Sequence, residues 1–192
     1  MTGHVNRTPV AKRGQSAASC PGDGRGMPNI RSAVPADVLS LPAIEAAAGE
    51  AFRSIGMPEV ADDPLPDVDE LIRHASEGRV WVATVSSEVV GYALAAVRDG
   101  SAHLEQVSVH SDHAGQRIGA DLIDAVASWA RDRGDERLTL TTFADVPWNA
   151  PYYRKLGFGA LPNDSLGPQL AAELSEERMR FTAPRIAMAR DV

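Results

Sequence analysis

The sequence predicts an α/β (α+β) fold in which a mixed, mostly antiparallel central sheet is flanked by helices. Three β-type runs follow one another between positions 80 and 109 with only short turns between them, which is typical of an antiparallel meander. A long amphipathic helix then begins at Ile118 and leads to another strand, and such a crossover joins two strands in parallel. Of the 192 residues, 44% are hydrophobic, which suits one sizeable core.

Each expected element has a local signal of its own. The helices begin at proline, aspartate or a small residue and mostly end at glycine, whereas the strands are rich in β-branched residues and are bounded by turn residues. The expected strands are 30–33, 80–85, 89–97, 103–109, 138–142, 158–161 and 185–189, and the expected helices are 35–55, 67–77, 118–133, 150–156 and 167–180. Residues 58–66 are expected to form an acidic loop, whose field would favour a cationic ligand nearby.

The first 26 residues differ in composition from the rest of the chain. They are rich in Gly, Ser, Pro and Arg and show neither helical nor strand periodicity. We therefore expect residues 1–26 to be a disordered N-terminal extension and residues 27–192 to be a single domain.

Charge and composition exclude several functional classes. The net charge is −7, and residues 27–192 are more acidic still because four basic residues but only one acidic residue lie in the first 26 positions. An acidic body repels nucleic acid, so no nucleic-acid partner is expected. No apolar run is long enough to span a membrane and no secretory signal is recognisable, which predicts a cytoplasmic protein without a membrane partner. The single cysteine excludes an intramolecular disulfide and a cysteine-based metal site.

The most informative stretch is HLEQVSVHSDHAGQRIGADLI, residues 103–123. Here a strand passes through a short polar loop with Gly115 into the helix that starts at Ile118. The free N–H groups and the positive end of the dipole at a helix start form a cradle for a pyrophosphate. Taken alone, the stretch fits an ordinary connection between a strand and a helix equally well.

The loop AGQRIG, residues 114–119, resembles the acyl-CoA loop of the GNAT N-acetyltransferase family, Q/R-x-x-G-x-G/A. Gly119 matches the pattern, whereas Ala114 replaces its Arg or Gln and Arg117 stands where its first glycine is expected. A negative φ at Arg117 would leave the cradle intact. The resemblance implies that the main chain of this loop binds the cofactor, through Gly115, Gln116, Arg117, Ile118 and Gly119.

A second motif, WNAPYYRKLGF at residues 148–158, resembles the Asn…Tyr-x-x-x-Gly-Phe element of the same family. It implies that Asn149 and Tyr153 contact the cofactor. Together with the order of the elements, the resemblance covers about residues 28–160. It implies transfer of an acetyl or other acyl group from acetyl-CoA to a primary amine of a small molecule or peptide, by direct attack in a ternary complex. Because members of the family are often dimeric, it also suggests a homodimer.

A tyrosine at position 153 suits the role of general acid. A phenol with a pKa of about 10 stays protonated at neutral pH and can give its proton to the departing CoA thiolate. A core aromatic residue is the alternative interpretation, and one member of the pair Tyr152 and Tyr153 is expected to be structural. We assign the acid to Tyr153 and a packing role, or a place in the acceptor-side wall, to Tyr152.

Glu105 is the candidate general base that removes a proton from the amine. Strict alternation places it on the same face as Val107 and Val109, whereas a bulge in the strand, usual in the family, would turn it to the other face. An exposed charge on a strand face is the alternative, and His103 and His110 are weaker candidates for the base. The resemblance implies that the main chain of Val107 and Val109 binds the pantetheine arm.

Two questions stay open at this level. The departures at Ala114 and Arg117 leave a non-catalytic acyl-CoA-binding or interaction module as the alternative function. The histidines at 103, 110 and 113 straddle a strand and a loop without further ligands, so no metal is expected.

Overall fold

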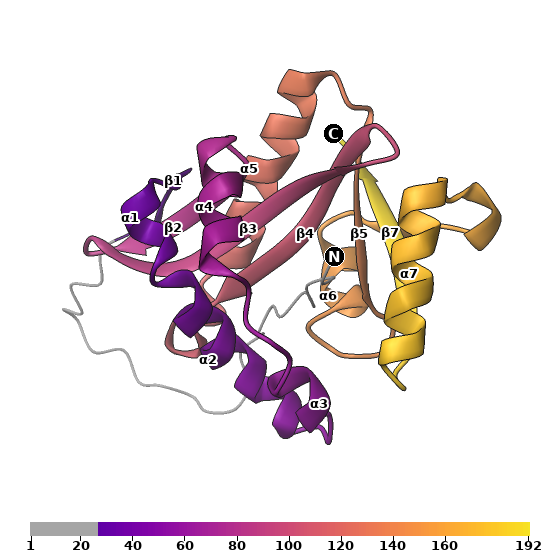
Figure 1. Ribbon diagram of the computed structural model, residues 1–192, viewed down its shortest axis with the longest axis horizontal. Coiled ribbons are helices and arrows are strands. Elements are labelled where there is room, and N and C mark those ends of the chain that lie inside the picture. The colour runs from indigo at the N-terminus through magenta and orange to yellow at the C-terminus, as the bar shows by residue number, and fades with distance from the viewer. Residues whose placement is uncertain (1–26) are drawn as a thin grey trace.

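The computed structural model describes residues 27–192, which form a seven-stranded sheet with helices on both faces (Figure 1). The strands are β1 Asn29–Ser32, β2 Val80–Val85, β3 Glu88–Arg98, β4 Ser101–Val109, β5 Arg137–Phe143, β6 Gly159–Ala160 and β7 Arg185–Asp191. They lie in the order β1-β2-β3-β4-β5-β7-β6. The pair β4 and β5 is parallel and the other neighbours are antiparallel, which confirms the predicted fold class. The predicted extension, residues 1–26, lies outside the described residues.

One of the expected helices is divided in two in the structure. They are α1 Pro35–Val38, α2 Leu41–Arg53, α3 Pro58–Ala61, α4 Val68–Ser76, α5 Ile118–Arg133, α6 Ala150–Lys155 and α7 Pro168–Arg180, with short 3₁₀ turns at Ser111–His113 and Asn163–Ser165. The expectation of a single helix over 35–55 is wrong. Pro42 has no N–H for the carbonyl of Val38, so the chain breaks at Leu39 and Ser40 and restarts as α2.

Two smaller expectations also need correction. The acidic segment 58–66 is not wholly a loop, because its first four residues form α3. The strand expected over 158–161 pairs only at Gly159 and Ala160. None of the helices within 27–192 is long and apolar enough to cross a membrane.

Alternation along the strands divides the core between the two faces of the sheet. Trp81 and Ala83 of β2 face α5, whose Ile118, Leu122 and Val126 are buried as the helical spacing predicts. Val80 and Val82, the alternate residues of the same strand, pack under α1, α2 and α4 on the opposite face. The sheet is thus covered on both sides.

Strands β4 and β5 separate soon after they meet. Their register contains only the pairs Ala102 with Leu138 and His103 with Thr139. β5 then continues beside β7 as far as Phe143, while β4 runs on beside β3 as far as Val109. The two strands diverge toward the loop that precedes α5, and α6 lies near this divergence (Figure 1).

Candidate active site

The loop before α5 has the geometry of an anion cradle. Gly115 and Arg117 both have positive φ, at 80° and 65°, and α5 starts immediately after them. The carbonyl of Arg117 accepts the N–H groups of Ala120 and Asp121, whereas no described residue accepts the main-chain N–H groups of residues 115–119. Residues 115–117 are exposed to solvent. Successive free N–H groups at the start of a sixteen-residue helix suit a pyrophosphate.

The conformation of Arg117 differs from the sequence-based expectation. A negative φ was expected, but Arg117 is in the left-handed region and serves as the N-cap of α5 without a side-chain capping bond. A residue with a Cβ pays about 1–2 kcal/mol for this conformation, which glycine adopts freely. Arg117 therefore keeps the backbone turn that a glycine would make, at a cost in strain, and its exposed guanidinium lies beside the cradle.

The predicted cofactor residues come together on the α5 face of the sheet. Val107, Val109, Ile118 and Tyr153 belong to one buried cluster, although they come from three separate elements. Gly119, in the first turn of α5, is also buried. Asn149 is buried and directly precedes α6, so this short helix starts beside the same cluster.

The two neighbouring tyrosines have different environments. Tyr153 is fully buried, and its ring lies 5.7 Å from those of Phe158 and Tyr152 between centroids. Tyr152 is only partly buried. Burial raises the pKa of Tyr152 to about 12, while the nearby charge of Arg117 opposes the rise. Tyr152 thus lies toward the cradle and Tyr153 lies deeper in the core.

A bulge in β4 turns Glu105 away from the α5 face of the sheet. Leu104 pairs with Ala95 and Gln106 pairs with Leu94, the next residue of β3, so Glu105 is the extra residue. The sequence analysis expected Glu105 to change faces if β4 contained a bulge, and β4 contains that bulge. The Glu105 side chain, 11% exposed, faces the opposite side from Val107 and Val109, toward α4 and α7. Arg98 Nη2 lies 3.6 Å from its carboxylate, and no described residue donates a hydrogen bond to it.

The alternative bases have other contacts. His103 is buried, with Nδ1 at 2.9 Å from Thr139 Oγ1 and Nε2 at 3.3 Å from Glu173 Oε1. His110 lies in the loop, where its Nδ1 accepts the N–H of Asp112 at 3.3 Å. Neither residue lines the cavity that Glu105 faces. In the described part of the chain, no three metal-ligating side chains gather in a way that could hold an ion.

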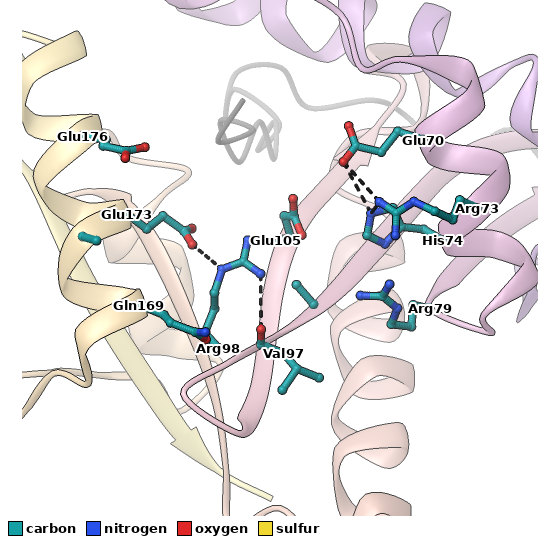
Figure 2. A pocket seen from close by; sticks show the side chains of 12 residues that line it. Glu70, Arg73, His74, Arg79, Val97, Arg98, Glu105, Gln169, Glu173 and Glu176 are labelled. Carbon is teal, nitrogen blue, oxygen red and sulfur yellow. Dashed lines mark hydrogen bonds and ion pairs between the residues drawn. The ribbon is translucent and has the colours of Figure 1, made fainter. Parts of the chain in front are cut away.

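Glu105 lines a cavity of about 430 Å³ that lies over β3 and β4, between α4 and α7 (Figure 2). Most of the lining side chains are charged or polar: Glu70, Arg73, His74, Arg79, Arg98, Glu105, Gln169, Glu173 and Glu176. Figure 2 shows the acidic residues of α7 on one side and Arg73, His74 and Arg79 on the other. The bulge therefore places Glu105 in a polar cavity on the face of the sheet opposite α5.

The acidic segment before α4 is compensated by neighbouring cations. Asp62 is ion-paired with Arg53 of α2, and Asp63 is ion-paired with Arg180 of α7. Both carboxylates thus join this segment to adjacent helices. The field that the acidic segment was expected to exert on a ligand is correspondingly reduced.

Comparison with known proteins identifies the family. The model of the acetyltransferase (GNAT) family matches residues 43–158, which is more than half of the chain. The protein belongs to the GNAT acetyltransferase family. This GNAT chain is also similar in fold to several solved structures. The ribosomal-protein-alanine N-acetyltransferase of Brucella melitensis is 24% identical, with a TM-score of 0.62 over 85% of this chain and 99% of that one.

Two further structures share the GNAT fold. The PaiA N-acetyltransferase of Thermoplasma acidophilum, in complex with coenzyme A, is 13% identical, with a TM-score of 0.64 over 86% of this chain and 99% of that one. A GNAT acetyltransferase of Staphylococcus aureus is 16% identical, with a TM-score of 0.65 over 85% of this chain and 98% of that one.

The sequence analysis of this GNAT protein missed most of the polar residues that line the cavity, among them His74, Arg79, Arg98 and Glu173. For His74 a signal existed, because it shares the buried face of α4 with Leu71 and Ala75. A polar residue at such a position points to a polar neighbour inside the fold. No local signal brings α7 against β3 and β4, since the ion pair of Arg98 with Glu173 spans 75 positions.

Proposed function

We propose that this GNAT protein is an N-acyltransferase, contained in residues 27–192, that moves an acetyl or other acyl group from acetyl-CoA to a primary amine of a small molecule or peptide. The observation that carries the proposal is the run of main-chain N–H groups at residues 115–119, which has no acceptor among the described residues. The N–H groups at a helix start bind phosphate oxygens. The fold shared with a CoA-bound acetyltransferase supports the same assignment.

The proposed binding mode follows the separation of β4 and β5. The pyrophosphate lies on residues 115–119, and the pantetheine arm follows the main chain of Val107 and Val109 as an added strand would. Asn149, which directly precedes α6, and Tyr153, within α6, approach the thioester end. This binding mode depends on main-chain groups more than on side chains. The departures from the family pattern at Ala114 and Arg117 therefore leave it intact.

The proposed reaction is direct transfer in a ternary complex. Glu105 accepts a proton from the ammonium group, directly or through one water molecule, and the amine nitrogen attacks the thioester carbonyl. The tetrahedral intermediate collapses as the carbon–sulfur bond breaks, and the Tyr153 hydroxyl protonates the departing thiolate. The extra proton on the nitrogen leaves through water and restores the Tyr153 hydroxyl. The products are the amide and free CoA. Holding both substrates in line supplies much of the rate enhancement.

A binding module without catalysis is the second candidate. The full burial of Tyr153 and the arginine at position 117 favour it. Release of free thiol from acetyl-CoA with a panel of amines separates the two functions, and calorimetry measures CoA binding alongside. We expect both CoA binding and amine-dependent thiol release. CoA binding without turnover of any amine would favour the module, and absence of CoA binding would overturn both functions.

A further inference from the structure

The cavity that contains Glu105 has two arginines on its α4 side, beside Glu70, and two glutamates on its α7 side. Arg73 belongs to α4 and Arg79 follows it, whereas Glu173 and Glu176 belong to α7 (Figure 2). A cavity with a cationic side and an anionic side is electrostatically complementary to a ligand that carries both charges. Its volume of about 430 Å³ suits a small molecule.

The two arginines on the α4 side of the cavity are paired with two carboxylates, one of which is Glu70, at 3.4 Å from Arg73. Glu77 is shared, because it pairs with Arg73 at 3.5 Å and also with Arg79. Arg79 is only 19% exposed. Partial burial lowers the pKa of Arg79, and repulsion by the charges of Arg73 and Arg98 lowers it further, while the charge of Glu105 opposes the shift. A bound carboxylate would relieve that repulsion and can accept two N–H bonds from a guanidinium.

Of the two nearly buried carboxylates of the cavity, Glu105 of β4 stays available to a ligand. Arg98 donates a hydrogen bond to Glu173 at 2.6 Å but lies 3.6 Å from Glu105. Glu173 is therefore neutralised by Arg98, and Glu105 has no hydrogen-bond donor among residues 27–192. A nearly buried carboxylate without a donor favours a cationic partner, and an ammonium group supplies up to three N–H bonds.

His74, on the same side as Arg73 and Arg79 (Figure 2), provides a further polar group. Burial lowers the pKa of His74, with Arg79 adding to the effect, so its imidazole is neutral at pH 7. Its Nδ1 is buried and has no partner in the described part of the chain. Buried polar atoms are rarely left without a partner, and a bound ligand or water would supply one.

We infer that the cavity binds the acyl acceptor as a zwitterion, a small amine that also carries a carboxylate, such as a free amino acid. The carboxylate lies against Arg73 and Arg79, and the ammonium group lies at Glu105, where it loses its proton before attack. The inference rests on the proposed function, because it takes Glu105 as the base, and it adds the chemical class of the acceptor.

The test compares free amino acids with their carboxamides, which keep the amine but lack the carboxylate. Each pair is assayed with acetyl-CoA by thiol release, using the wild type, Arg79→Gln and Arg73→Gln. We expect at least one free amino acid to exceed its carboxamide about tenfold or more in kcat/KM, as for loss of a charge-assisted hydrogen bond. Arg79→Gln should lower kcat/KM for the free amino acid much more than for its carboxamide and so remove most of this preference, and Arg73→Gln should weaken it.

Arg131→Gln is the matched control, because Arg131 lies on the exposed face of α5 and donates a hydrogen bond to Ser128. It should leave the preference unchanged. The assignment of a zwitterionic acceptor would be overturned if carboxamides reacted as well as the free amino acids. It would also be overturned if Arg79→Gln lowered kcat/KM equally for both. Either result would leave the acyltransferase function intact.

If CoA binds but no amine reacts, saturation-transfer NMR of the amino acids with CoA present decides the question. Binding that requires the carboxylate and is lost in Arg79→Gln supports the cavity assignment, and absence of binding overturns it. If acetyl-CoA itself does not bind, the proposed function fails and this inference fails with it.

Discussion

Glu173 Oε2 accepts a hydrogen bond from Arg98 Nε at 2.6 Å and thereby joins helix α7 to strand β3. His103 of β4 contacts the other oxygen of the same carboxylate. Burial alone would raise the pKa of Glu173, but the hydrogen bonds and charges of His103 and Arg98 lower it to about 2. This carboxylate therefore fixes one wall of the cavity in its ionised form.

The first prediction is a contribution of Glu173 to stability that depends on pH. Its carboxyl has a pKa of about 2 in the folded chain against 4.5 when unperturbed, so it stabilises the fold above pH 4.5 and loses this contribution as the pH falls toward 2. The shift corresponds to about 3 kcal/mol. Urea unfolding should show Glu173→Gln less stable than the wild type at pH 6, with the difference shrinking at pH 3. Glu176→Gln, an exposed change in the same helix, should behave like the wild type at both values, and a difference for Glu173→Gln that does not vary with pH would contradict the assignment.

The second prediction concerns the left-handed conformation of Arg117. Replacing Arg117 with glycine removes a strain of about 1–2 kcal/mol but increases the entropy of the unfolded chain, so the net gain in unfolding free energy should be up to about 1 kcal/mol. Gln116→Gly, at a neighbour without a positive φ, should destabilise instead. Thermal and urea unfolding measure both variants. Equal destabilisation by the two changes would show that Arg117 has no strain to relieve.

The third prediction tests the cradle. Gly119→Val places a branched side chain in the first turn of α5, where the pyrophosphate must approach the main chain, and should abolish detectable CoA binding in calorimetry. Arg117→Ala should weaken binding by only about 0.5–3 kcal/mol, because it removes at most one hydrogen bond to a charged group. Ser128→Val, on the exposed face of the same helix, is the control, because it introduces valine into α5 away from the cradle and should leave CoA binding unchanged. Normal CoA affinity in Gly119→Val would place the cofactor elsewhere.

The fourth prediction separates the two tyrosines. Tyr153→Phe should lower kcat by about 10²-fold or more and leave CoA affinity unchanged, as expected when an acid catalyst is lost. Tyr152→Phe should have a much smaller effect on kcat, since this residue lies toward the cradle. Steady-state kinetics with any accepted amine makes the comparison. Similar losses in both variants, or none in either, would remove Tyr153 from the proposed mechanism.

Much of the architecture follows from local patterns in the sequence. Period-two runs at 80–85 and 89–97 predict the meander, and the spacing of Ile118, Leu122 and Val126 predicts the buried face of α5. The cradle is equally local, because a strand, a short polar loop and a helix start are adjacent in the chain. The sequence by itself therefore determined the fold class and the family.

The tertiary structure decided features that depend on distant partners. Glu105 faces the cavity only because β4 holds one more residue than β3 at that point, and a bulge depends on how two strands pair rather than on the composition of one. The cavity joins α4 to α7 across about one hundred residues, and no local pattern encodes such a contact. Periodicity reports which face of an element is buried, whereas the partner on that face is chosen by packing of the whole chain.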